Sequence, residues 1–227
     1  MGATYQPTTM FYETPGANLN FVSLAGYVRN DLNWVEVTVG TTVIKQQQWK
    51  LERGAFSYGI VTDNAAVPTT GSGTYTGNMI GSVVLNPTLD STGNLPNYFQ
   101  WMSGTSTTTV NFASGAVTLG LNGIIGRANF DRNTTQQTVS VASGTSFTAS
   151  GTAAIDLVRN GGFTGQFQSA RFGSTTNGTD PVISIAGSSI DGAFYGPAAN
   201  EVGGGFRIVG GNPDQRIDIV GAFKGKR

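Results

Sequence analysis

Residues 191–208, "DGAFYGPAANEVGGGFRI", decide how this chain folds. Two runs of glycine and aromatic residues flank an abrupt break at Gly196-Pro197. Proline cannot donate to a strand ladder and readily starts a turn, so the segment predicts two strands joined by a corner. The residues that define this corner are Gly192, Phe194, Tyr195, Gly196, Pro197, Glu201, Gly204 and Phe206.

The corner has two interpretations. One is a loop that contacts a ligand through Tyr195 and Glu201. The other, which we favour, is a structural corner in which the Glu201 carboxylate accepts hydrogen bonds from the exposed amides at the start of the turn. A phosphate-binding loop is excluded because no phosphate-binding lysine and no helix of any length follow the glycines.

Outward from the corner, short segments alternate apolar and polar residues between turn residues. Examples are "WVEVTVG" at 34–40 and "QTVSVA" at 137–142. Such alternation is typical of antiparallel strands with one buried face. The chain has 33 glycines, many inside these segments, and mid-strand glycine favours the sharp coiling of a closed barrel. Helical patterns are nearly absent, so we expect an all-β protein.

Composition excludes several function classes. Thirteen basic residues balance thirteen acidic ones, which argues against a nucleic-acid partner. The absence of histidine and cysteine removes the common catalytic base, the thiolate nucleophile and the usual metal ligands. We therefore predict no enzyme, no cofactor and no metal site. Only Tyr or Met could ligate a haem, and Asp156, Asp191, Glu201, Asp214 and Asp218 show no spacing that identifies a glycosidase pair.

One apolar cluster interrupts a polar region at 97–104, "NYFQWMSG". Aromatic and methionine side chains anchor protein interfaces, so we predict that this cluster contacts a partner. In the alternative, Phe99 and Met102 begin a strand whose inner face is core, and Trp101 lies over the barrel rim. The predicted partner-binding residues are Leu95, Tyr98, Phe99, Trp101 and Met102.

Four segments carry a resemblance to a known family. "GAFYGPAANEVGGGF" at 192–206 resembles the signature of the β-barrel domain of bacterial transferrin-binding protein B. "VPTTGSGTYTG" at 67–77, "VNFASGAVTLGL" at 110–121 and "VGAFKGKR" at 220–227 are similar to further strands of that domain, in the same order. The first segment is specific, and the other three support it.

The resemblance implies an eight-stranded antiparallel up-and-down β-barrel with additional hairpins and little helix. We expect residues 1–20 to form a loosely structured arm and residues 21–227 to form a single barrel domain. The location implied is the bacterial cell surface, either on the outer membrane or secreted, with any outer-membrane association through a missing N-terminal region.

The resemblance also implies recognition of a host or environmental macromolecule, a protein or haem-type ligand, in iron or haem acquisition. The alternative is a structural or export-directing C-terminal barrel of a larger envelope protein. A third hypothesis, a carrier of a small apolar ligand inside the barrel, requires an open interior.

Overall fold

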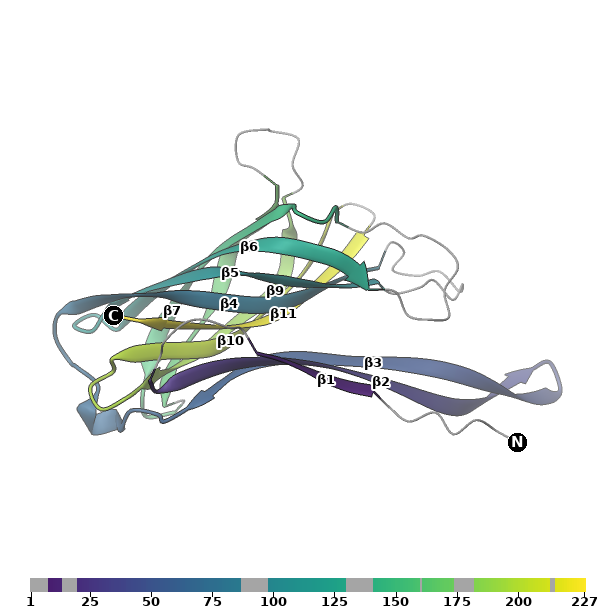
Figure 1. Ribbon diagram of the computed structural model, residues 1–227, viewed down its shortest axis with the longest axis horizontal. Helices are drawn as coiled ribbons and strands as arrows, with labels where there is room; N and C mark the ends of the chain where they lie inside the picture. Colours follow the sequence, from purple (N-terminus) through teal and green to yellow (C-terminus); the bar gives the residue numbers. More distant parts are fainter. Residues whose placement is uncertain are drawn as a thin grey trace.

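The computed structural model describes residues 8–13, 20–86, 98–129, 141–159, 161–173, 182–212 and 215–227. Figure 1 shows a barrel beside a smaller sheet with one long ribbon. The barrel strands are β4 (Ser72–Asn86), β5 (Tyr98–Asn111), β6 (Ala116–Asn129), β7 (Ser146–Asp156), β8 (Gly162–Phe172), β9 (Ser184–Tyr195), β10 (Glu201–Asn212) and β11 (Gln215–Lys226).

The barrel confirms the predicted fold class. Its eight strands follow one another around the wall in chain order, and β11 closes it by pairing with β4. Every neighbouring pair is antiparallel. Among the described residues the helical content is one 3₁₀ turn, Asn64–Ala66.

The first three strands form a separate sheet rather than part of the barrel. They are β1 (Thr8–Glu13), β2 (Val22–Val39) and β3 (Thr42–Gly59), in the order β1-β2-β3. Segments from residue 21 onward that we expected in the barrel therefore lie outside its wall, and the barrel begins at Ser72. Whether sheet and barrel fold as the single domain predicted for 21–227 stays a prediction, because strand pairing does not test it.

The barrel interior is filled by its own side chains. Phenylalanine rings meet across it: the Phe163 and Phe194 centroids are 5.5 Å apart, and those of Phe167 and Phe206 are 5.9 Å apart. Aliphatic residues and Met79 and Met102 pack around these rings. An interior of this kind holds no small apolar ligand, so the carrier hypothesis is wrong.

Small residues in the wall make room for these rings. Gly192 of β9 lies directly over Phe163, and a Cβ added there would stand 2.2 Å from Phe163 Cζ. Phe163 has no exposed surface and so has no free space into which to move. Glycine at this position is therefore required by packing.

We predict that Gly192→Ala destabilises the protein by roughly 1–3 kcal/mol, the usual cost of overpacking a filled core. Gly187→Ala is the matched control on the same strand, because nothing lies within 4 Å of a Cβ at that position. The control should change the free energy of unfolding little or raise it. Urea titration followed by tryptophan fluorescence measures both values, and equal values for the two variants would contradict the packing argument.

Candidate functional site

The corner predicted from the sequence is the β9–β10 turn, and it holds the three-stranded sheet against the barrel. Tyr195 ends β9 and Glu201 begins β10. Between them Gly196 adopts a φ of +83°, a conformation that favours glycine. A Cβ there would also lie 2.6 Å from the Phe21 ring, so glycine lets the start of β2 approach.

The Glu201 carboxylate links the two sheets, beside an apolar contact in which Leu24 of β2 packs on Ile80 and Ala222 of the barrel. Glu201 is 3% exposed, and it accepts hydrogen bonds from the backbone amides of Asn20 at 2.7 Å and of Phe21 and Val22 at 2.9 Å. We predicted that backbone amides satisfy this carboxylate, and they do. They belong to the start of β2, however, because Glu201 points outward from β10 towards the sheet. In the turn itself, the Ala198 amide donates to Asn200.

The other corner residues support this junction. Gly203 lies under the sheet, where a Cβ would stand 2.7 Å from Val22 Cγ2. The Tyr195 and Ser57 hydroxyl oxygens lie 3.3 Å apart, which connects the corner to β3. Thr62, beyond β3, donates to the Gly196 carbonyl at 2.5 Å.

The remaining predicted corner residues divide between core and solvent. Phe194 and Phe206 are buried in the barrel core, and Pro197 is exposed. A Cβ at Gly204 would come within 2.8 Å of the Phe223 ring. In the described positions, this segment therefore contacts the barrel core on one side and the start of the three-stranded sheet on the other.

A second link between the sheets is electrostatic. Arg53 of β3 is 10% exposed; its Nη1 donates to Ser82 Oγ and its Nη2 to the Asp218 carbonyl, both at 2.9 Å. The Asp218 carboxylate lies 3.5 Å from Arg53 Nη2 and 3.0 Å from Arg207 Nη2. Burial lowers the pKa of Arg53, an effect that Asp218 partly offsets, and the hydrogen bond to Asp218 raises the pKa of Arg207.

The predicted partner-binding cluster is divided by the barrel wall. Met102 is 2% exposed and points into the core. Trp101 points outward from β5 onto the sheet, where a Cβ at Gly26 would lie 2.9 Å from its ring. Leu95 lies outside the described residues, as do the side chains of Tyr98 and Phe99. Partner contact by this cluster stays a prediction.

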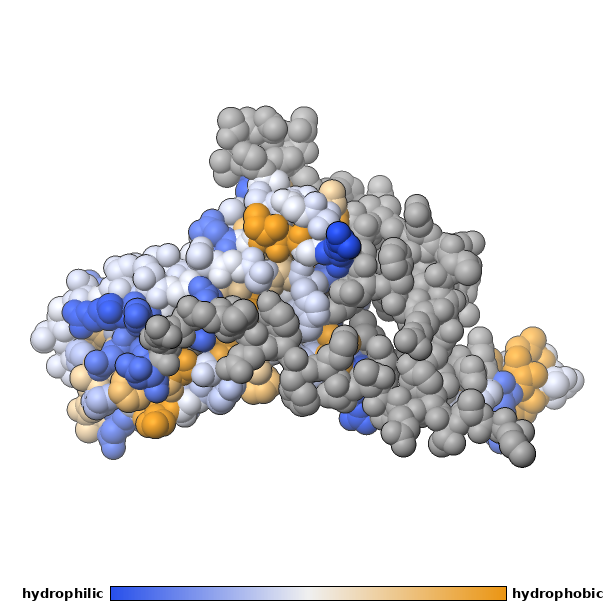
Figure 2. All heavy atoms as spheres, viewed as in Figure 1, coloured by the Kyte–Doolittle hydropathy of each residue, from blue (hydrophilic) through white to orange (hydrophobic). Residues whose placement is uncertain are grey.

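The sequence reading missed an exposed apolar surface on the β2–β3 hairpin, residues 34–45, which we call the ribbon. It extends beyond the barrel, and its tip carries apolar residues on the visible face (Figures 1 and 2). Exposure there is 61% for Val39, 43% for Ile44 and 63% for Trp34. The alternation at 34–40 predicted a strand with one buried face. In the structure no element of the described chain covers that face, and the alternation alone could not show this.

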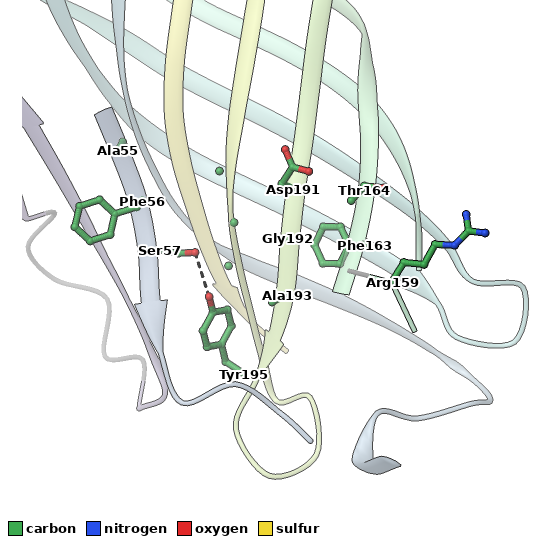
Figure 3. Close-up of a pocket in the computed structure, with 13 residues that line it drawn as sticks. Ala55, Phe56, Ser57, Arg159, Phe163, Thr164, Asp191, Gly192, Ala193 and Tyr195 are labelled. Atoms are coloured by element: carbon green, nitrogen blue, oxygen red, sulfur yellow. Dashed lines mark hydrogen bonds between the residues drawn. The ribbon is translucent and has the colours of Figure 1, made fainter. Parts of the chain in front are cut away.

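A groove lies between β3 and the barrel, with a volume of about 550 Å³ (Figure 3). Ala55, Phe56 and Ser57 of β3 form one side, and Arg159 and Thr164 form the other. Its floor is made by β9 and β10. The floor and its remaining lining residues are Phe163, Asp191, Gly192, Ala193, Tyr195, Gly203, Gly204 and Gly205.

Within the described ranges, no three His, Cys, Asp or Glu side chains gather as a metal site. The same residues include no helix with the length and hydrophobicity of a membrane span.

We predict that Glu201→Gln frees the start of β2 while leaving the barrel intact. An amide nitrogen replaces one acceptor oxygen and faces backbone donors, so about 2 kcal/mol of charge-assisted bonding is lost locally. Amide hydrogen exchange should accelerate at Asn20, Phe21 and Val22 but not in β6 or β7. Glu36→Gln is the control, since Glu36 lies in an exposed pair with Lys45. Unchanged exchange at the start of β2 would contradict the role given to Glu201.

We also predict that Asp218→Asn lowers the free energy of unfolding by about 2 kcal/mol, because it leaves the buried Arg53 charge without its counter-ion. This loss of free energy is smaller than the loss expected for a fully buried ion pair, because the Asp218 side chain is 24% exposed. Arg207→Gln, which removes only the exposed partner of Asp218, should cost less than 1 kcal/mol. Urea unfolding of both variants measures the difference, and an equal loss would show that the buried pair has no special weight.

Comparisons with solved structures gave low similarity over a long alignment. A crystal structure of a transferrin-binding protein B double mutant from Haemophilus parasuis Hp5 is 18% identical, with a TM-score of 0.42, and the match covers 97% of this chain and 37% of that one. Isotype 1 transferrin-binding protein B from serogroup B Neisseria meningitidis is 16% identical, with a TM-score of 0.36 and coverage of 96% and 36%. This chain therefore spans less than two fifths of those proteins.

No curated protein matches the chain. The family model of the C-lobe and N-lobe β-barrels of Tf-binding protein B matches residues 67–227, more than two thirds of the sequence. The matched range begins just before β4 and contains the whole barrel with its β9–β10 corner. The chain belongs to the family of transferrin-binding protein B β-barrels.

Proposed function

We propose that this protein is a non-enzymatic binding module of the bacterial cell surface that recognises a host protein in iron acquisition. Family membership supports the proposal, since the family is named for barrels of a transferrin-binding protein. The observation that carries it for this chain is the apolar ribbon. A binding surface that extends away from its scaffold is accessible to a large partner.

The ribbon has one face that favours contact with protein. The register pairs Val37 with Ile44 and Val39 with Thr42, and successive side chains on a strand alternate between faces. Val35, Val37, Val39 and Ile44 therefore share one face of a two-stranded ribbon. An isolated hairpin is marginally stable in water, and exposed apolar clusters of this kind mark interaction sites.

Charge contributes little to the proposed contact. The exposed ion pair within the ribbon joins Glu36 and Lys45 at 4.0 Å, so the two charges offset each other. The chain as a whole has a formal net charge of zero. Affinity would then come from burial of the apolar face, with little dependence on salt concentration.

The cluster around Trp101 remains a second proposed contact surface, and its partner would be a protein or a haem-type ligand. Localisation to the outer membrane or to the secreted fraction belongs to the same proposal. The alternative function, a structural or export-directing barrel of an envelope protein, predicts no host ligand at all.

The test is biolayer interferometry with immobilised iron-loaded and iron-free mammalian transferrins, haemoglobin and haem. The wild type should bind a transferrin, and the double variant Val39→Lys, Ile44→Lys should weaken the Kd tenfold or more, equivalent to about 1.4 kcal/mol. The control Thr38→Lys, Thr41→Lys adds the same charge near the tip but leaves Val39 and Ile44 in place, because Thr38 pairs with Val43 on the opposite face. It should retain most of the affinity.

Other outcomes distinguish the alternatives. Binding that survives the ribbon variant but is lost in Trp101→Ala would assign the contact to the Trp101 cluster. Binding to haem alone would replace the protein partner with haem. A wild type that binds none of the four probes would overturn recognition of host iron proteins and favour the export-directing role.

A further inference from the structure

The groove of Figure 3 is bordered by an unpaired strand edge. In the order β1-β2-β3, strand β3 pairs with β2 along residues 42–59 and with no other strand among the residues that the structure describes. The Ile60 amide donates to the Phe21 carbonyl, and backbone hydrogen bonds in an antiparallel pair alternate along each strand. The backbone N–H and C=O groups of even-numbered β3 residues near Ile60 therefore point towards β2. The backbone groups of Arg53, Ala55 and Ser57 then point towards the groove, and no strand of the described chain pairs with them.

The floor of the groove suits an added strand. Ala193 of β9 and Gly205 of β10 present nothing larger than a methyl group. At Gly205 a Cβ would meet its nearest neighbour, the Gly221 carbonyl, at 3.8 Å, so there is open space above it. A strand beside β3 would lie about 4.8 Å away, and its alternate side chains would enter this space.

The far side of the groove supplies charge. Asp191 of β9 is exposed, and neither its carboxylate nor the guanidinium of Arg159 has an ion-pair partner within the described ranges. A basic side chain on the added strand would be attracted to Asp191.

We infer that this groove binds one extended peptide segment of a partner protein, which pairs with β3 as a fourth strand and places a basic side chain opposite Asp191. The backbone edge provides affinity for any extended segment. The shallow floor and the Asp191 carboxylate select its side chains.

A second copy of this chain does not fit the same place. If the β3 edges of two copies paired antiparallel, they would form one continuous sheet with a two-fold axis perpendicular to it. The barrels of both copies would then lie on the same face of that sheet. The added β3 would occupy the groove above β9 and β10, and the barrel attached to it would overlap the first barrel. A single peptide strand carries no such bulk.

This inference is independent of the ribbon and of transferrin. It concerns residues 53–57 and the barrel wall, whereas the proposed function concerns the ribbon at 34–45. Failure of one therefore leaves the other intact, and the two are tested with different variants.

The probe is a displayed library of random 12-residue peptides, selected on the full chain. Peptides recovered should contain Lys or Arg within an alternating β-type sequence. When a recovered peptide binds, the amides of Ala55 and Ser57 should become protected from hydrogen exchange, while those of Gly54 and Phe56 should change little.

Gly205→Leu fills the groove floor and should weaken peptide binding tenfold or more without lowering the urea midpoint of unfolding. Gly187→Leu is the matched control, because a Cβ there meets nothing within 4 Å and Gly187 does not line the groove. Asp191→Asn should weaken binding of the basic peptides severalfold.

Three results would overturn the inference. These are a library that yields no peptide, peptides that bind both leucine variants equally, and peptides that leave Ala55 and Ser57 unprotected. Sedimentation velocity of the free protein tests the remaining occupant: a dimer that Gly205→Leu dissociates would assign the edge to a second copy and reject the peptide.

Discussion

Three backbone amides bonded to the Glu201 carboxylate determine where the N-terminal sheet lies on the barrel. A buried carboxylate is costly unless its oxygens are satisfied, and here the donors are the first residue of β2 and the two residues before it. The start of β2 is therefore located to within hydrogen-bond distance. Strand β3 follows by pairing with β2, and the groove and ribbon take their positions from that pairing.

The barrel could be predicted because its sequence pattern and its corner agree. Alternation indicated strands, glycines indicated tight coiling, and the Gly196-Pro197 break indicated where two strands meet. The separate sheet could not be predicted in the same way. Buried residues recur at every second position from Val22 to Val28, as they do in the barrel strands. Such a period shows that a face is buried without showing which element buries it.

The candidate site was predicted less well for a similar physical reason. Trp101 and Met102 are adjacent in sequence, but consecutive side chains of a strand point to opposite faces, so the wall separates them. The groove depends on residues from β3, β8, β9 and β10, and no local pattern connects them. For Glu201 the kind of partner was predicted correctly, because a lone carboxylate beside a turn usually accepts hydrogen bonds from backbone amides. The amides that donate to it lie 179 to 181 residues away in the sequence, and no local pattern indicates them.

Strand β11 gives the fold a fixed order of completion. It stands between β10 and β4, and its Val220 pairs with Ser82, 138 residues earlier in the chain. It also supplies Asp218, the counter-ion of Arg53 under the sheet. During synthesis from the N-terminus, the wall stays open until residues 215–226 emerge. Closure at such long range is slow, so the edges of β4 and β10 that β11 joins stay unpaired until that strand arrives.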